Sequence, residues 1–358
     1  MGNEQLIHII KNRINQEGPI SFKDFMDMCL YYPKLGYYQA DRERTGKQGD
    51  FYTSANVSPI FGEVIASYIK KLWERLECPK NFKIVEFGAG KGQLAHAILG
   101  VLSNEQELYA SLQYYIIDAS ESFRHMQQQL LQGYPVKWVN SLEEIDNVVG
   151  CILSNELFDA FPVHIVQMID NQLHEKFVTY NPLNREFEFQ LKAASIELCE
   201  FFNEQKVILI NHQEAEVNLQ AKQWIQQSAK YLNGGDIITI DYGYTADEIY
   251  APARMTGTLQ CYNKHQVSDN TLVRIGLQDI TSHVNFSQLI QWGEVEGLQT
   301  VSYQTQHEFL MQNGILDKLS QNLSSNPFDP IFKRNNAIKQ LIMPGGMGDT
   351  FKVLIQRK

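Results

Sequence analysis

Three glycines at alternate positions stand between a short apolar run and an amphipathic stretch. The run, Lys83–Phe87, has the composition of a strand and carries an acid at Glu86. The glycines are Gly88, Gly90 and Gly92. Apolar residues then recur at helical spacing over 94–99, so the segment predicts a strand, a tight turn and a helix. Glycines at such a turn let the main chain approach a ligand, and the N–H groups of the helix start face that ligand.

The spacing of these glycines indicates the class of ligand. A dinucleotide fingerprint requires glycine at its first, third and sixth positions, but the sixth position counted from Gly88 is Gln93. Gly92 instead completes a G-x-G-x-G pattern, with Glu86 two residues ahead of the first glycine. This variant resembles the nucleoside loop of class I S-adenosylmethionine (SAM) methyltransferases, whose cofactor has no pyrophosphate. We therefore expect a SAM site, with a plain packing turn as the alternative for this loop. Because Gln93 breaks the dinucleotide fingerprint, a nicotinamide-dependent oxidoreductase ranks only third among the possible functions, behind a methyltransferase and an assembly chaperone.

A second acid stands at the end of the next strand-like run. Asp118 follows Tyr114–Ile117 at about the distance downstream that is typical of a ribose-binding acid. A carboxylate can accept hydrogen bonds from both ribose hydroxyls, and such charged acceptors bind more strongly than neutral ones. The alternative is that Asp118 caps the helix expected over Glu121–Leu131, but Ser120 can do this instead. We expect Asp118 to bind ribose.

Polar residues also end the fourth expected strand, in the segment Ser154–Pro162. Ligands of open α/β sheets bind beyond the carboxyl ends of the strands. Glu156 and Asp159 are three residues apart and would share a face in a helical turn, where they could clamp a guanidinium. The alternative is that one acid caps a helix and the other is solvated. Asn155 could bind the cofactor or satisfy the backbone of the loop.

The fold class follows from strands that alternate with helical patterns. The strands are expected at 83–87, 114–118, Val136–Asn140, Cys151–Ser154 and Asp236–Tyr242. This rhythm predicts an α/β protein with a Rossmann-like parallel sheet and helices on both faces. Further pieces are short strands near 163–190, a helix at 217–231 and a last strand from Phe351 to Ile355.

The expected domain organisation has two parts. Residues 1–80 form a mainly helical N-terminal cap region, in which Gly18-Pro19 ends the first helix and Ser21 caps the next. Residues 81–358 form the Rossmann-like domain, with an α+β insertion at about 163–232. The dense loop 49–54 could be a lid that excludes water, although Asp50 in it could be only a turn residue.

Composition and charge limit the function classes. The 358 residues are 44% hydrophobic and 20% charged, as in a soluble globular protein. The net charge is −10, from 31 basic and 41 acidic residues, and would repel a phosphate backbone. Nucleic acid therefore falls in rank as a partner, and a cationic acceptor such as an arginine or lysine side chain rises.

Compartment and metal content are also predicted. No apolar run approaches the length of a membrane span, and no signal peptide precedes the first helical pattern, so we expect no membrane insertion and a cytoplasmic protein. The five cysteines are scattered and form no C-x-x-C pair, which indicates reduced thiols and no metal site. His283 is expected to be structural rather than a base.

Motifs along nearly the whole chain resemble the MidA-like methyltransferases, a family that includes a mitochondrial complex I assembly factor that methylates arginine. The matching segments are Gly18–Ser21, Tyr31–Tyr38, Gly49–Phe51 with Thr53, Phe61–Glu63, Glu86–Gly92, Asn155–Val163, Asp241–Gly243, Asp279–Phe286, Met347–Asp349 and Phe351–Leu354. One departure is Asp118-Ala119-Ser120, where relatives are expected to have Glu-Ile-Ser. The shorter acid keeps the charge and changes its reach.

The resemblance implies a SAM-dependent methyltransferase of the class I fold that acts on a protein, with an arginine nitrogen as the best acceptor. For the cofactor we expect Gly88, Gly90 and Gly92 to cradle the amino-acid and ribose part, Asp118 to hold the ribose and Ser141 or Leu142 to border the adenine, with Glu86 and Asn155 as further cofactor-binding residues. Glu156 and Asp159 would then hold the cationic acceptor.

The resemblance also has wider implications. A link to assembly of respiratory complex I follows from it, and the chain, which shows no mitochondrial presequence, is expected to be a bacterial member. The rival function is a non-catalytic assembly chaperone that uses the surface of a SAM fold to bind a partner. The sequence leaves the oligomeric state open.

Overall fold

A computed structural model describes residues 2–40, 59–263, 266–320, 326, 328–343 and 345–358. The chain forms two compact units, each assembled from segments that are far apart in the sequence. Unit 1 comprises Met1–Phe51, Phe158–Gln223 and Tyr244–Leu289. Unit 2 comprises Tyr52–Leu157, Trp224–Gly243 and Ile290–Lys358. The candidate lid at 49–54 lies outside the described residues.

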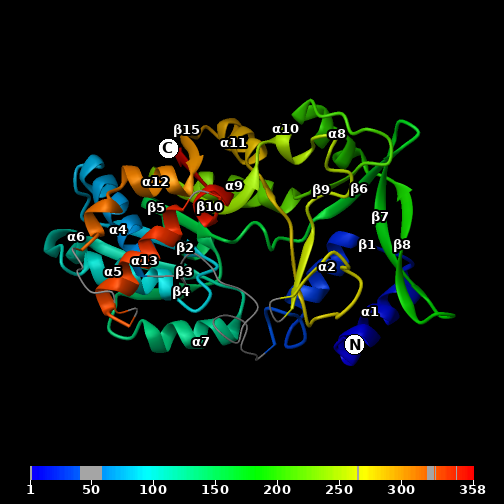
Figure 1. Cartoon of the computed structure of the whole chain (residues 1–358), viewed down its shortest axis with the longest axis horizontal. Helices are drawn as coiled ribbons and strands as arrows, with labels where there is room; N and C mark the ends of the chain where they lie inside the picture. The colour runs from blue at the N-terminus through cyan, green and yellow to red at the C-terminus, as the bar shows by residue number, and fades with distance from the viewer. Residues whose placement is uncertain (1, 41–58, 264–265, 321–325, 327, 344) are drawn as a thin grey trace. The chain divides into compact units, whose positions relative to one another are not determined.

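Unit 2 contains the predicted parallel sheet (Figure 1). Its strands are β2 (Phe82–Phe87), β3 (Leu112–Ile117), β4 (Val136–Val139), β5 (Val148–Asn155), β10 (Leu232–Tyr244), β15 (Gln299–Thr305) and β16 (Phe351–Arg357). Their order is β15-β16-β10-β5-β2-β3-β4. The five strands from β10 to β4 are parallel, and β16 runs antiparallel to both of its neighbours. The predicted positions of all these strands except β15, which was not predicted, are confirmed to within a few residues.

Helices pack against this sheet, and their apolar side chains form a large core with those of the strands. They are α4 (Pro59–Arg75), α5 (Gln93–Leu102), α6 (Gln106–Ser111), α7 (Glu121–Leu130), α12 (Gln306–Gln312), α13 (Pro330–Ile342) and α14 (Met347–Thr350), with short 3₁₀ turns at Leu142–Glu144 and Leu316–Lys318. Side chains of α4, α5, α12 and α13 are buried together with strand residues such as Tyr114 and Ile238. The helix predicted at 121–131 is confirmed, and Ser120 caps it by accepting from the N–H of Phe123. Although α4 precedes the first strand of the sheet, it belongs to unit 2.

A buried carboxylate braces the start of β10. Asp236 is 0% exposed and accepts hydrogen bonds from the guanidinium groups of Arg75 on α4 and Arg357 on β16. The hydroxyl of Tyr68 donates to the same carboxylate. A buried charge needs such partners because desolvation otherwise penalises it heavily. The contacts therefore join α4, β10 and β16 at one point.

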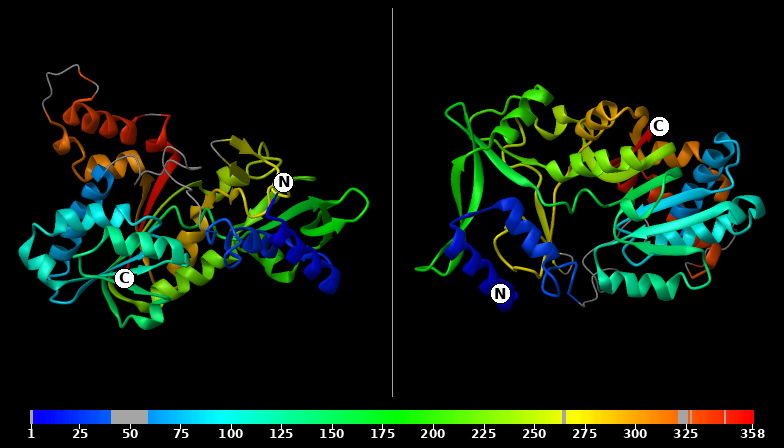
Figure 2. Two further views of the ribbon diagram at one scale, coloured as in Figure 1. Left: turned by 90° about the horizontal axis from the view of Figure 1, so that it is seen from below. Right: turned by 180° about the vertical axis from the view of Figure 1, so that it is seen from behind.

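Unit 1 is α+β and contains the predicted insertion. An antiparallel sheet runs in the order β1-β7-β6-β9, and β8 also pairs with β7. Figure 2 shows this sheet in green beside the blue N-terminal helices. The elements are α1 (Glu4–Glu17), β1 (Ile20–Ser21), α2 (Phe22–Tyr31), β6 (His164–Ile169), β7 (Gln172–Asn181), β8 (Glu186–Ala193), α8 (Ile196–Gln205) and β9 (Glu214–Val217).

The last segment of unit 1 adds a small sheet in the order β12-β11-β13. The elements of this segment are α10 (Ala246–Ile249), β11 (Gln260–Asn263), β12 (Gln266–Ser268), β13 (Asp279–Thr281) and β14 (Val284–Asn285). Two helices contain residues of both units: α9 (Leu219–Tyr231), which confirms the helix predicted at 217–231, and α11 (Phe286–Val295). No helix in the described part of the chain is both long and apolar enough to cross a membrane.

One core holds the N-terminal helices against the insertion. Leu6 and Ile10 of α1 and Phe25 of α2 are buried in the same cluster as Ile165 of β6 and Val178 of β7. The pairing of Ile20 with Val178 extends this contact through β1. The N-terminal helices and the insertion, separate in the sequence-based description, thus form one folded unit.

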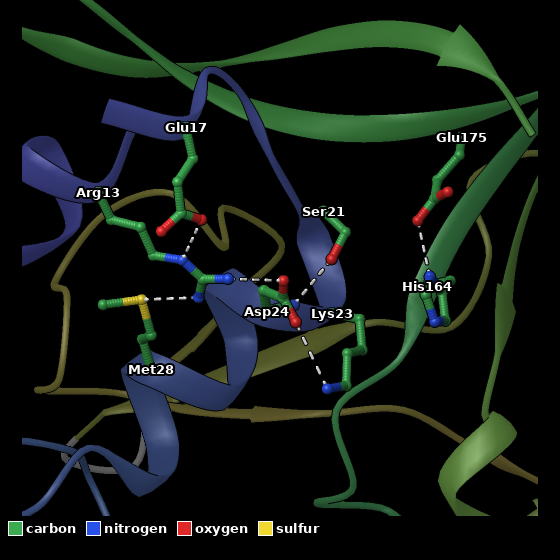
Figure 3. Close-up of polar contacts among 8 residues, drawn as sticks. All are labelled: Arg13, Glu17, Ser21, Lys23, Asp24, Met28, His164 and Glu175. Atoms are coloured by element: carbon green, nitrogen blue, oxygen red, sulfur yellow. Dashed lines mark hydrogen bonds and ion pairs between the residues drawn. The ribbon is translucent and has the colours of Figure 1, made fainter. Parts of the chain in front are cut away.

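Polar side chains fix the two N-terminal helices to each other, as Figure 3 shows. Arg13 of α1 donates to Glu17 on its own helix and to Asp24 on α2, each at 3.0 Å. Ser21 caps α2 as predicted, by accepting from the N–H of Asp24. On the neighbouring strands, His164 Nδ1 lies 2.6 Å from the carboxylate of Glu175.

Candidate cofactor site

The carboxyl edge of the unit 2 sheet has the topology of a ligand site. β2 pairs with β3 on one side and with β5 on the other, so the direction of chain winding reverses next to β2. In open α/β sheets ligands bind in the crevice at such a reversal, outside the carboxyl ends of the strands. The glycine loop, residues 88–92, follows β2; Asn155 is the last residue of β5, and Glu156 follows it. The fold therefore brings these two predicted groups to one edge.

The glycine loop has a backbone that other residues rarely adopt. Gly88, Gly90 and Gly92 have φ values of 65°, 54° and 81°. A Cβ at Gly88 would come within 2.9 Å of Leu157, and one at Gly92 within 3.2 Å of Gln127. Among the described residues, nothing would lie within 4 Å of a Cβ at Gly90. Close packing thus explains the outer two glycines, whereas no described residue packs against Gly90 in this way.

Asp118 lies at the end of β3 and belongs to a buried hydrogen-bond network. It is 7% exposed; its Oδ1 accepts from the N–H of Ser120 at 2.9 Å and its Oδ2 from the amide of Gln127 at 2.8 Å. Burial raises the pKa of Asp118, while the bonds from Ser120, Gln127 and the backbone of Gly90 oppose that rise. A carboxylate offers about four acceptor positions. These three donors therefore leave it capacity for one further donor.

Two side chains of α7 that the sequence analysis did not select hold this edge together. Arg124 donates to the carbonyl of Asp118 at 2.6 Å and to the carbonyl of Val139 at 3.0 Å, which joins the ends of β3 and β4. Gln127 contacts the glycine loop and Asp118. Neither residue stands in a motif, so only the three-dimensional arrangement reveals them.

Glu86 is buried within β2 below the glycine loop. It is 2% exposed, and the hydroxyl of Tyr114 donates to its Oε2 at 2.7 Å. Burial raises the pKa of Glu86 from 4.5 to about 7; the bond from Tyr114 opposes the rise and the charge of Asp118 adds to it. This acid can therefore change its protonation state near neutral pH.

We expect a Glu86→Gln variant to change the pH dependence of stability. Because the folded protein holds the proton of Glu86 more tightly than the unfolded chain, wild-type stability falls as pH rises from about 4.5 to about 7. The shift corresponds to about 3 kcal/mol. Urea unfolding at pH 5 and pH 8 should show the variant gaining up to that amount relative to wild type at the higher pH. The exposed acid Glu143, changed to Gln, is the matched control; equal slopes for all three proteins would contradict the burial argument.

The end of β5 has an unusual backbone at an acidic residue. Glu156 has φ +53°, and its N–H donates to the carbonyl of Ile240 on β10 at 2.9 Å. The next N–H, of Leu157, donates to Asp241 Oδ2 at 3.2 Å. Asn155 donates to the carboxylate of Glu156 at 3.2 Å, whereas its buried Oδ1 has no hydrogen-bond partner among the described residues. A left-handed conformation at a residue other than glycine costs free energy and is concentrated at functional sites.

The helical turn that would place Glu156 and Asp159 on one face is not formed. Residues 156–163 form bends and turns rather than a helix, because Glu156 has already left the right-handed helical region. Glu156 belongs to unit 2 and Asp159 to unit 1. Within unit 1, the carbonyl of Asp159 accepts from the N–H of Ser282 at 2.9 Å. Their joint action as a clamp therefore stays a prediction.

The remaining predicted residues lie at the ends of other elements. Ser141 and Leu142 follow β4, and Leu142 is buried at the start of a 3₁₀ turn. In unit 1, the Tyr38 hydroxyl donates to Asp279 at 2.7 Å. Burial and the charge of Arg254 lower the pKa of His283 to about 4, so its imidazole is neutral at pH 7. The adenine-bordering role of Ser141 and Leu142 stays a prediction.

Comparison with known proteins identifies the family. Residues 64–304 match the family model Methyltransf_28, described as "Putative S-adenosyl-L-methionine-dependent methyltransferase". The chain belongs to this family. The family resemblance seen in the sequence is thereby confirmed, and the chain is a SAM-dependent methyltransferase with the class I fold.

Curated relatives of this methyltransferase match it over most of their length. It is 27% identical to the mitochondrial protein arginine methyltransferase NDUFAF7 of Danio rerio, over 98% of this chain and 86% of that protein. It is also 27% identical to the Homo sapiens protein of the same name, over 95% of this chain and 80% of the other.

A solved structure agrees with the class I fold and with SAM as the cofactor. A protein from Burkholderia thailandensis, crystallised with S-adenosyl-homocysteine, is 28% identical to this methyltransferase and superposes with a TM-score of 0.88, covering 99% of this chain and 92% of that chain. Among the described residues of our structure, no group of three or more His, Cys, Asp or Glu side chains is placed to hold a metal ion.

Proposed function

We propose that this methyltransferase modifies an arginine side chain of a protein, in support of respiratory complex I assembly. The observation that carries the proposal is the match over 98% of the chain to a relative named protein arginine methyltransferase. The net charge of −10 supports a cationic acceptor, since an acidic surface attracts a basic protein segment.

The cofactor would lie at the carboxyl edge of the unit 2 sheet. Two observations support this placement: no described residue would lie within 4 Å of a Cβ at Gly90, and the buried Oδ1 of Asn155 has no hydrogen-bond partner among the described residues. In this proposal the glycine loop and Glu86 hold the amino-acid and ribose part. Asp118 accepts from the ribose, and Ser141 and Leu142 border the adenine. When bound, SAM supplies a methyl group on a positively charged sulfur.

Glu156 is the acid proposed to receive the acceptor. The contact from Asn155 orients its carboxylate, and the bonds from its own N–H and from that of Leu157 fix the loop against β10. A carboxylate can bind a guanidinium through two charge-assisted hydrogen bonds and so orient one of its nitrogens. An arginine nitrogen loses a proton as it gains the methyl carbon, and the same carboxylate can favour that loss. Asp159 is proposed as the second acid for the same cation.

Methyl transfer can be tested directly with isotopically labelled SAM. The purified enzyme is incubated with proteins from cells that lack it, and the labelled protein is hydrolysed for amino-acid analysis. We expect the label in methylarginine, in a protein of complex I, and much slower labelling with a Glu156→Gln variant. Label in another methylated amino acid would overturn the arginine assignment. Binding of S-adenosylhomocysteine without any transfer would instead favour the assembly chaperone.

A further inference from the structure

The buried amide of Gln127 links three elements at the cofactor edge. Gln127 lies on α7 and is 0% exposed. Its Nε2 donates to the carbonyl of Gly90 at 2.7 Å and to Asp118 Oδ2 at 2.8 Å. Its Oε1 accepts from the indole N–H of Trp138 on β4 at 2.9 Å. One side chain thus connects the glycine loop with the ends of β3 and β4.

The chemistry of its partners allows only one orientation of this amide. The indole of Trp138 can only donate, and the carbonyl of Gly90 can only accept. The oxygen of Gln127 must therefore face Trp138, and both of its N–H bonds point to the loop and to Asp118. The loop also packs on the stem of this side chain, because a Cβ at Gly92 would lie 3.2 Å from Gln127 Cγ.

These contacts connect Gln127 with the groups that would bind the cofactor, rather than with the apolar core alone. Replacing Gln127 by an apolar residue would leave three polar partners without this hydrogen bond, whereas a glutamine that only filled space would have no such partners. Here two of those partners are the carbonyl of Gly90 and the carboxylate of Asp118. Loss of the amide would free both to move.

We propose that Gln127 is a positioning residue, which holds the glycine loop and Asp118 at the separation that SAM requires. It acts through these two groups and does not itself touch the cofactor. The inference rests on the proposed role of Asp118 in ribose binding. The adjacent Gln128 and Gln129 are exposed and provide controls within the same helix.

The test uses the variants Gln127→Met, which keeps the length of the side chain without its polar atoms, and Gln128→Met. Calorimetric titration with S-adenosylhomocysteine should show about tenfold or greater loss of affinity in the first and no loss in the second, as expected when hydrogen bonds to a charged group are removed. Hydrogen exchange in the free protein should accelerate at the amides of residues 88–92 and stay unchanged in β16.

Wild-type affinity in Gln127→Met would overturn the inference, and so would unchanged exchange in the glycine loop. If that variant does not fold, Trp138→Phe provides the second test, because it removes the indole N–H that donates to Gln127 Oε1 and keeps an aromatic ring at this position; unchanged affinity there would also overturn the inference. An Asp118→Asn variant distinguishes failure of the proposed ribose binding by Asp118 from failure of the proposed positioning by Gln127. Normal affinity in that variant would remove Asp118 from ribose binding, while the result for Gln127 would still decide positioning through Gly90.

Discussion

A Gly90→Val variant is expected to lose saturable SAM binding. Gly90 has φ +54°, a conformation that is a strong outlier for a β-branched residue and costs on the order of 1–3 kcal/mol. The added side chain would also extend from the loop to a place where no atom of the described residues lies within 4 Å of a Cβ, and which is the proposed place of the cofactor. Together these effects should weaken affinity by at least about 100-fold, which equals about 2.7 kcal/mol. Calorimetric titration with SAM measures the change.

A matched control separates backbone strain from loss of the site. Gly297 has φ +81°, lies between α11 and β15, and likewise has no described residue within 4 Å of the position of a Cβ. Gly297→Val should therefore lower stability to a similar extent and leave SAM affinity unchanged. Retained affinity in folded Gly90→Val would exclude the loop from the cofactor site.

A Glu156→Gln variant is expected to bind SAM normally and to transfer methyl groups on the order of 100-fold more slowly. Glutamine keeps the size of the side chain and an oxygen that can still accept from Asn155, so the loop after β5 should hold its shape. It removes the negative charge that would bind and orient a guanidinium. Single-turnover transfer of labelled methyl to the acceptor protein, at saturating SAM, measures the rate.

Two further variants are measured beside Glu156→Gln: one at the second predicted acid, and a control that changes an exposed acid on α6. Asp159→Asn, tested in parallel, shows whether the other predicted acid contributes. Glu107→Gln changes an exposed acid on α6 and should not alter transfer. Unchanged transfer in Glu156→Gln would remove this residue from the acceptor site, and lost SAM binding would reassign it to the cofactor.

The parallel sheet and the edge that carries the candidate site could be predicted from the sequence because both depend on short-range patterns. The strand that ends at Phe87, the glycine loop and Asp118 each follow from local alternation and turn residues. The reversal of winding at β2 then brings the loop and the end of β5 together. Ser120 as the helix cap also followed from residue type and position alone.

The rest could not be predicted because it depends on long-range contacts. Gln127 stands in a run of three glutamines; its spacing of four from Phe123 places it on the buried face of the helix, but its partners Gly90 and Trp138 come from other elements that residue type does not reveal. Unit 1 joins α1 and α2 to β6 and β7, which are more than a hundred residues away in the chain. The helical turn expected at 156–159 fails because Glu156 adopts a left-handed backbone, which residue type does not reveal.

The strand order of unit 2 has a consequence for how this protein is made. Among the described strands, β15 pairs only with β16, which follows it along the chain by more than forty residues. Until β16 emerges from the ribosome, β15 has no place in the sheet, and its backbone groups remain available to other chains. Exposed, unpaired strands promote aggregation in incompletely folded proteins. Nascent chains that stall between residues 305 and 351 should therefore depend on chaperones more than the finished enzyme does.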